Sequence, residues 1–172
     1  MNRQGLLLRT FAAGLTAILM GLCLAAAARP APAKADEPFE VVKTGEFEGV
    51  IIPREKARDF MKVFSGMEEK ETWTPGRTDV LKLEKGIESF LKKAAPKGSQ
   101  DLWTKIPTYK RQYIGIVRKG RKVIFINFFC DAFNSDWKTV PVVVDDGGDC
   151  FFNVLYDPGS ATFSELRING VA

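Results

Sequence analysis

The sequence predicts an α+β fold in which one main helix packs on one face of a curved antiparallel sheet of about five strands. Two observations predict it. A long amphipathic helical pattern ends near residue 96, and from residue 109 onward short apolar runs alternate with turn sequences. Most of the separators between these runs carry Gly or Pro, as tight turns require, and short connections favour antiparallel neighbours.

Residues 1–35 are expected to be a signal peptide. Arg3 and Arg9 make a basic start, an apolar run covers residues 11–28, and residues 33–35 read Ala-Lys-Ala, with small side chains where a signal peptidase reads. Cleavage is expected near Ala35, which would export the remainder to the periplasm or the medium.

Two alternatives to a cleaved signal peptide stay open. Cys23 could be acylated as in a lipoprotein, although Leu22 stands where that processing requires a small side chain. The apolar run is also just long enough to remain as an uncleaved membrane anchor. A membrane partner is expected only through such an uncleaved leader.

The formal net charge of +4 comes from the leader. Arg3, Arg9, Arg29 and Lys34 lie there without an acid, so the remaining 21 basic groups equal the 21 acidic groups of the chain. A balanced domain lacks the electrostatic footprint of a nucleic-acid-binding protein. No nucleic-acid partner is expected.

Residues 36–45 are expected to form a flexible tether, and residues 46–172 a single α+β domain. Residues 46–53 show the alternation of a strand and end at a proline. Residues 54–64 read as a short helix, because apolar side chains recur at spacings of three and four, namely Ala57, Phe60, Met61 and Phe64.

The main helix is expected between Thr74 and Pro96. Thr74 can cap it, and Pro75 suits the first helical position because no backbone donor is needed there. Pro96 and Gly98 stop it. Its buried stripe is expected to consist of Val80, Leu83, Ile87, Phe90 and Leu91.

The runs after the helix are expected to form an antiparallel meander. The turn at residues 157–160, Asp-Pro-Gly-Ser, suits a type II turn with Gly159 at positive φ. The expected strands are residues 111–117, 122–130, 139–145, 150–156 and 161–168.

The residue content excludes several chemistries. The chain has no histidine, which excludes Ser-His-Asp and Cys-His catalysis and histidine-ligated zinc within it. Phosphate-binding and nucleophile-elbow motifs are also missing. We therefore expect no catalytic residue, no metal and no cofactor, and the chain is more typical of a binding protein than of an enzyme.

Residues 145–149, Asp-Asp-Gly-Gly-Asp, are open to three interpretations. The aspartates could bind calcium or take part in catalysis, but the EF-hand order is not matched. A hairpin tip that needs Gly147 and Gly148 at positive φ is the simpler interpretation. In a meander this acidic tip would face the basic tip at residues 118–121; an anionic ligand for the basic stretch 105–122 is the alternative.

Cys130 and Cys150 lead to conflicting expectations. Two cysteines in an exported domain favour a disulfide. In a plain meander, however, the strand at residues 139–145 would hold them about 20 Å apart, and a disulfide needs Cα atoms within about 7 Å. The pairing therefore stays open at this stage.

A candidate binding surface consists of aromatic and basic residues, with packing at the core or its rim as the alternative role. The residues concerned are Trp73, Trp103, Tyr109, Arg111, Tyr113 and Trp137.

Five segments together resemble a family of small exported bacterial proteins without assigned activity. They are WTP at 73–75, RQYIG at 111–115, INFFC at 126–130, DGGDCFFNVLYD at 146–157 and NGVA at 169–172. The resemblance implies export and one domain, and it supplies no site residues. A looser fold analogy is to cystatins, since residues 112–115 resemble their inhibitory loop, although the glycine comes one residue early.

The leading functional expectation is a non-catalytic exported domain that binds a protein, a peptide or an envelope component. Two alternatives remain: a binder of a small apolar ligand between helix and sheet, and a small enzyme that uses carboxylates. A deep cavity would favour the ligand binder, and converging acids would favour the enzyme.

Overall fold

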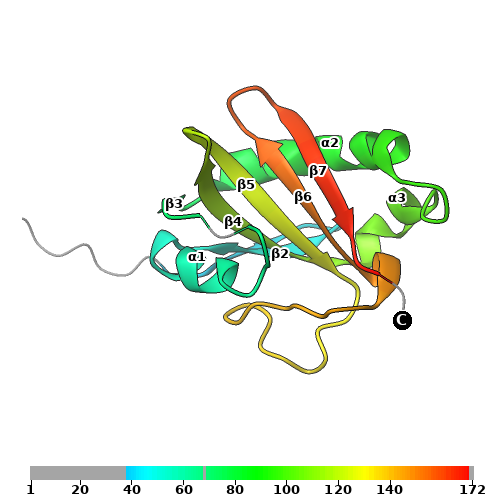
Figure 1. The fold of residues 1–172 in the computed structure, drawn as a ribbon, viewed down its shortest axis with the longest axis horizontal. Coiled ribbons are helices and arrows are strands. Elements are labelled where there is room, and N and C mark those ends of the chain that lie inside the picture. The colour runs from blue at the N-terminus through cyan, green and yellow to red at the C-terminus, as the bar shows by residue number, and fades with distance from the viewer. Residues whose placement is uncertain (1–37, 68, 171–172) are drawn as a thin grey trace, which may run out of the picture. The chain divides into compact units, whose positions relative to one another are not determined.

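The computed structural model describes residues 38–67 and 69–170 (Figure 1) and confirms the α+β class. The expected signal peptide and its cleavage site lie outside these residues. The helices are α1 (Arg54–Met61), α2 (Arg77–Ala94) and α3 (Leu102–Lys105), with 3-10 turns η1 (Ile106–Thr108) and η2 (Gly148–Cys150). The strands are β1 (Glu40–Lys43), β2 (Glu48–Ile52), β3 (Thr72–Trp73), β4 (Lys110–Arg118), β5 (Arg121–Phe129), β6 (Phe151–Asp157) and β7 (Thr162–Ile168).

The sheet has seven strands in the order β1-β2-β4-β5-β6-β7, with β3 paired to β4. All neighbours are antiparallel except β2 and β4, which are parallel. The expected antiparallel sheet is therefore confirmed except at this one parallel pair. A parallel pair needs a crossover connection, and the long segment that contains α1, β3 and α2 supplies it.

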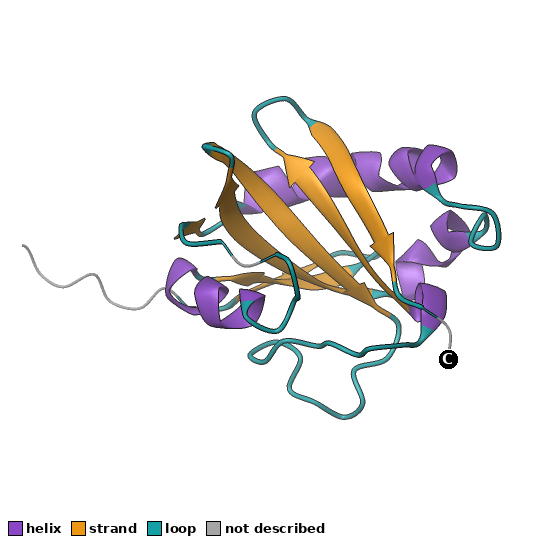
Figure 2. Ribbon diagram, in the orientation of Figure 1, coloured by secondary structure: helices purple, strands orange, loops and turns teal. Residues whose placement is uncertain are grey.

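Two segments differ from what the sequence predicted for the strands. β1 lies within residues 36–45, which were expected to be a tether, and pairs with β2 from Glu40 to Lys43. The expected strand at residues 139–145 does not form; residues 130–147 are a long loop (Figure 2). Consequently β5 pairs directly with β6.

The turns follow the local sequence only in part. At the β4–β5 turn, Lys119 and Gly120 both have positive φ (51° and 75°), as a two-residue type I′ hairpin requires. At the β6–β7 turn the positive φ falls on Ala161 (54°) and not on Gly159, so the type II assignment is wrong. The carboxylate of Asp157 accepts hydrogen bonds from the amides of Gly159 and Ser160 and sets that turn instead.

Helix α2 packs on one face of the sheet and crosses behind β6 and β7 in the view of Figure 1. Its expected stripe is confirmed for Val80, Leu83, Ile87 and Leu91, while Phe90 is half-buried and stacks on Phe163 of β7 at 5.2 Å. Each fully buried aliphatic side chain contributes about 1.5–3 kcal/mol. The stripe therefore anchors α2 to the sheet.

The start of α2 lies later than expected. Gly76 is the N-cap, so Thr74 does not cap the helix and Pro75 does not occupy its first turn. The hydroxyl of Thr74 instead accepts a hydrogen bond from the amide of Arg54 at 3.0 Å. Thr74 thereby links the segment before α2 to the start of α1, which covers the opposite face of the sheet with Ala57, Phe60 and Met61.

Candidate functional site

A cavity of about 540 Å³ lies beside α2, between the β1–β2 turn and the segment α3–η1. Its polar side chains include Glu84 of α2 and Arg111 of β4. The apolar part of its wall is contributed by Phe47, Leu81, Ile87, Trp103, Ile106 and Pro107.

Arg111, Glu84 and Tyr113 form a buried polar cluster at this cavity. The side chains of Arg111 and Glu84 are 1% and 7% exposed. The Tyr113 hydroxyl donates to Glu84 Oε1 at 2.7 Å, and Arg111 Nε lies 3.3 Å from the same oxygen. The Arg111 Nη1 atom donates to the carbonyl oxygen of Tyr109 at 2.5 Å.

One donor of this cluster is unsatisfied. Arg111 Nε is buried, and among the described residues it is the one buried side-chain nitrogen or oxygen without a hydrogen-bond partner. Its 3.3 Å approach to Glu84 is an ion-pair distance, but the N–H group does not point along a hydrogen bond. The pair is therefore electrostatically matched, and its hydrogen bonding is incomplete.

The neighbouring elements explain why these side chains meet. Residues 111 and 113 alternate with 112 along β4, so both point toward α2. Glu84 lies among the stripe positions of α2, between Leu83 and Ile87. Gly49 stands opposite Arg111 in the β2–β4 register, and a Cβ there would lie 2.5 Å from the Tyr113 ring. Glycine at 49 therefore makes room for that ring.

Aromatic rings flank the buried cation. The guanidinium carbon of Arg111 lies 5.1 Å from the ring centroid of Phe47 and 5.4 Å from that of Phe128. Such cation–π contacts stabilise a desolvated guanidinium by about 0.5–2 kcal/mol each. They hold its plane without using any of its N–H donors.

Burial controls the ionisation of the acid and the phenol. Desolvation raises the pKa of Glu84, and the Arg111 charge and the Tyr113 hydrogen bond oppose that rise. Burial also raises the pKa of Tyr113 well above its ordinary value, so its hydroxyl remains a donor. Glu84 is thus a carboxyl group whose proton is held more tightly than in water.

The other acids of the cavity wall are placed differently. Glu88 forms an ion pair with Lys92 at 2.6 Å, and Glu46 is exposed. The Lys92 ammonium also lies 4.0 Å from the centroid of the Trp103 ring. The geometry therefore places one buried acid beside one buried cation at this cavity.

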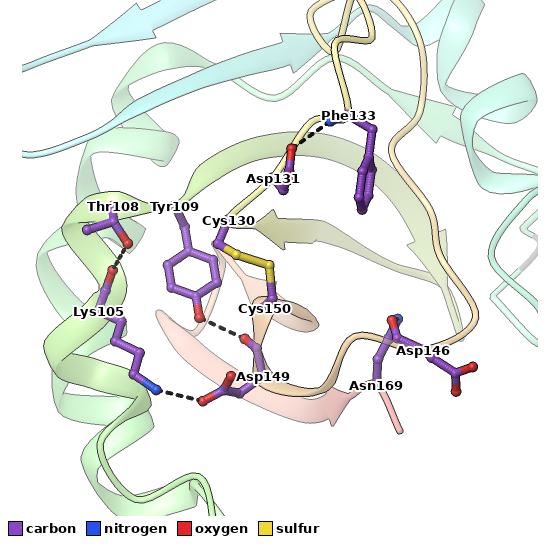
Figure 3. The surroundings of a disulfide bond; sticks show 10 residues. All are labelled: Lys105, Thr108, Tyr109, Cys130, Asp131, Phe133, Asp146, Asp149, Cys150 and Asn169. Atoms are coloured by element: carbon purple, nitrogen blue, oxygen red, sulfur yellow. Dashed lines mark hydrogen bonds and ion pairs between the residues drawn. A yellow bond between two sulfur atoms is a disulfide. The ribbon is translucent and has the colours of Figure 1, made fainter. Parts of the chain in front are cut away.

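The disulfide Cys130–Cys150 is present, with Cα atoms 5.1 Å apart (Figure 3). The bond is possible because residues 139–145 are not a strand, so the end of β5 and the start of β6 lie side by side. The Cys130 amide also donates to the Cys150 carbonyl oxygen at 3.0 Å. The predicted disulfide is therefore confirmed, and the predicted strand that would have separated the two cysteines does not form.

The acidic residues 146–149 do not face the basic turn 118–121, which corrects that expectation. They lie at the end of β5 opposite to that turn, next to the disulfide. The Asp149 carboxylate forms an ion pair with the Lys105 ammonium at 2.9 Å, and the Asp149 carbonyl oxygen accepts a hydrogen bond from the Tyr109 hydroxyl at 2.7 Å (Figure 3). Gly147 and Gly148 have the expected positive φ (105° and 55°), but in a 3-10 turn and not in a hairpin.

The basic turn pairs with acids of β6 and β7. Arg118 pairs with Glu165 at 2.8 Å, and Arg121 pairs with Asp157 at 3.2 Å. These are charge pairings within one end of the sheet. Ion pairs this exposed contribute about 0–1 kcal/mol each.

A ladder of buried and half-buried amides holds the long loop on the α1 side of the sheet. Gln112, Asn127 and Asn153 stand in register on three adjacent strands and hydrogen-bond to one another. Gln112 also donates to the carbonyls of Trp137 and Val140, at 2.6 Å each, and Asn127 donates to that of Val142 at 2.7 Å. The loop backbone is thereby satisfied by side chains and not by strand pairing.

The residues expected to form one binding surface are distributed over the molecule. Tyr109, Arg111 and Tyr113 are buried. Trp103 and Arg111 line the cavity together. Trp73 donates to the carbonyl of Ile116 at 3.1 Å, and Trp137 packs edge-on against Phe129 on the loop side. Residues 112–115 lie within β4, not at a hairpin tip as in a cystatin inhibitory loop.

The sequence reasoning missed Glu84 and Gly49. Glu84 carried a signal, because it lies four residues after Val80 and three before Ile87, which is a stripe position of the helix occupied by an acid. Gly49 carried only the break in a strand pattern. Among the described residues, no group of three or more His, Cys, Asp or Glu side chains could hold a metal ion.

In the described part of the chain, none of the helices combines the length and the apolar character needed to cross a bilayer. Comparison of the chain with protein-family models, with curated proteins and with solved structures gives no match. The resemblance to small exported bacterial proteins therefore stays a prediction.

Proposed function

We propose that this protein is an exported, non-catalytic binding protein that holds a small molecule with an apolar body and a polar end in the cavity beside α2. The observation that carries the proposal is the buried guanidinium of Arg111 in a partly apolar cavity, whose Nε is ion-paired with Glu84 at 3.3 Å but makes no well-formed hydrogen bond. A buried donor without a partner costs about 1–3 kcal/mol. A ligand that accepts this hydrogen bond would recover that free energy.

The cavity has the properties of a small-molecule site. Its volume of about 540 Å³ lies within the range typical of ligand pockets. Six of its thirteen lining residues are apolar or aromatic, and the other seven are polar or charged, among them the buried pair Arg111 and Glu84. Apolar walls supply affinity and the polar cluster sets the orientation of the ligand.

Export rests on two supports. The pattern of residues 1–35 is that of a signal peptide. The disulfide Cys130–Cys150 is a bond that persists in oxidising compartments.

The experiment is a binding titration with a fluorescent apolar probe, anilinonaphthalene sulfonate, on the folded domain. Leu81→Trp fills the cavity from the partly buried side of α2, and we expect it to weaken probe binding at least tenfold. Val63→Trp is the matched control, since Val63 is 41% exposed and belongs to the other side of the sheet. Unchanged probe binding in a folded Leu81→Trp variant would contradict the proposal.

A second candidate function is the docking of a protein through the loop at residues 131–145. It is favoured by apolar side chains on a loop that is stapled by a disulfide and an amide ladder: Phe133 is 60% exposed and Val143 is 46% exposed. A preorganised loop loses little entropy on binding. Crosslinked capture from envelope extract should yield a partner that Phe133→Ser and Val143→Ser both lose; a partner retained by both variants excludes the loop.

A further inference from the structure

We propose that the ligand of the cavity is an apolar monocarboxylate, that its carboxylate binds Arg111, and that one proton is taken up on Glu84 as it binds. This inference rests on the proposed function and names its ligand class. The geometry that carries it is one guanidinium with unused donors beside one acid in a closed polar cluster.

The guanidinium has donors to spare. It carries five N–H groups in a planar fork; Nη1 donates to the Tyr109 carbonyl oxygen, and Nε lies 3.3 Å from Glu84 Oε1, which leaves the Nη2 edge of the fork for a ligand. The rings of Phe47 and Phe128 hold it without consuming donors. A carboxylate accepts two parallel bonds from such a fork, whereas an alcohol or an amine cannot.

Glu84 is the reason that a proton must enter. Its Oε1 atom already accepts the Tyr113 hydroxyl at 2.7 Å and lies 3.3 Å from Arg111 Nε. A second carboxylate beside the same cation would leave two negative charges and one positive charge buried together. Protonation of Glu84 from solvent restores a neutral cluster, and the new O–H group donates to the ligand carboxylate.

The surrounding charges point in the same direction. From β4, Arg111 and Tyr113 face Glu84; from the β1–β2 turn, Glu46 adds a negative charge that favours the protonated form. On α2 itself, the cavity wall includes Lys85 and Glu88, and Glu88 is engaged by Lys92. Burial already raises the pKa of Glu84 in the empty protein, so the cost of its protonation is reduced in advance.

The consequence is a pH-dependent affinity. Above the pKa of Glu84 in the empty protein, the Kd for the carboxylate should rise about tenfold per pH unit, because one proton enters with each ligand. Glu84→Gln mimics the protonated acid, keeps a donor and removes the titration. This variant should bind the carboxylate with a Kd that is independent of pH.

The test uses calorimetric titrations of octanoate, 1-octanol and octylamine between about pH 6 and about pH 9, where octanoate is ionised. Measurements in buffers of different ionisation enthalpy count the protons. We expect octanoate to bind at least tenfold more tightly than the other two, with uptake of one proton by the wild type and none by Glu84→Gln.

Three outcomes overturn the inference. They are tighter binding of octylamine or octanol, octanoate binding without proton uptake, and proton uptake that persists in Glu84→Gln. Any of these leaves the proposed function standing if Leu81→Trp still abolishes binding. If none of the three probes binds, the proposed function fails as well. Tyr113→Phe provides a second variant in case Glu84→Gln does not fold, and it should shift the pH dependence to higher pH, since Glu84 loses a hydrogen bond that lowers its pKa.

Discussion

Loss of the disulfide should destabilise the domain by about 3 kcal/mol. The bond joins cysteines separated by 20 residues, and closing a loop of this length removes that much conformational free energy from the unfolded chain. The native side should change little. The Cys130 amide still donates to the Cys150 carbonyl oxygen, and the amide ladder still holds the loop in the reduced protein. The effect therefore acts mainly through the unfolded state.

The assay is urea unfolding of the oxidised wild type, the reduced wild type and the double variant Cys130→Ala/Cys150→Ala. With a slope of about 1–3 kcal/mol per molar urea, the midpoint should fall by roughly 1–3 M. Octanoate binding should be unchanged in folded protein, because neither cysteine lines the cavity. A decrease in the free energy of unfolding of less than about 1 kcal/mol would refute the reasoning, and so would a loss of octanoate binding in protein that is still folded.

Three further predictions concern single buried residues. Gln112→Leu should lower the free energy of unfolding by about 2–4 kcal/mol, because it leaves the Val142 amide and two loop carbonyls without partners. The loop at residues 131–145 should then become sensitive to protease, and an unchanged urea midpoint would contradict this prediction. Glu84→Gln should gain stability relative to the wild type as the pH rises, because the raised pKa of Glu84 makes the wild type lose stability between the ordinary pKa of a glutamate and the pKa in the folded protein. Parallel curves of stability against pH for the two proteins would exclude this effect. Gly49→Ala should destabilise the fold by about 1–3 kcal/mol, because the added methyl group clashes with the Tyr113 ring. The same substitution should cost less stability in a Tyr113→Leu background, and full additivity of the two substitutions would argue against the clash.

Local patterns predicted the elements whose neighbours are close in the chain. The stripe of Val80, Leu83, Ile87 and Leu91 identified α2 and its buried face, because helical periodicity is a property of one segment. The β4–β5 hairpin followed from the Lys-Gly pair at its turn. The apolar run at residues 139–145 misled the assignment, because its backbone groups are satisfied by the amides of Gln112 and Asn127 from distant strands.

The candidate site depends on contacts that no single segment contains. Arg111, Glu84 and Gly49 come from β4, α2 and β2, and the parallel β2–β4 pair that aligns them arises from a crossover. The sequence by itself determined the lack of histidine, the formal net charge and the main helix. The tertiary structure alone decided the disulfide, the separate positions of the acidic and basic turns, and the burial of Arg111. The physical reason is that pairing and burial depend on which segments meet in space, whereas composition and helical periodicity are properties of the chain that do not depend on its folding.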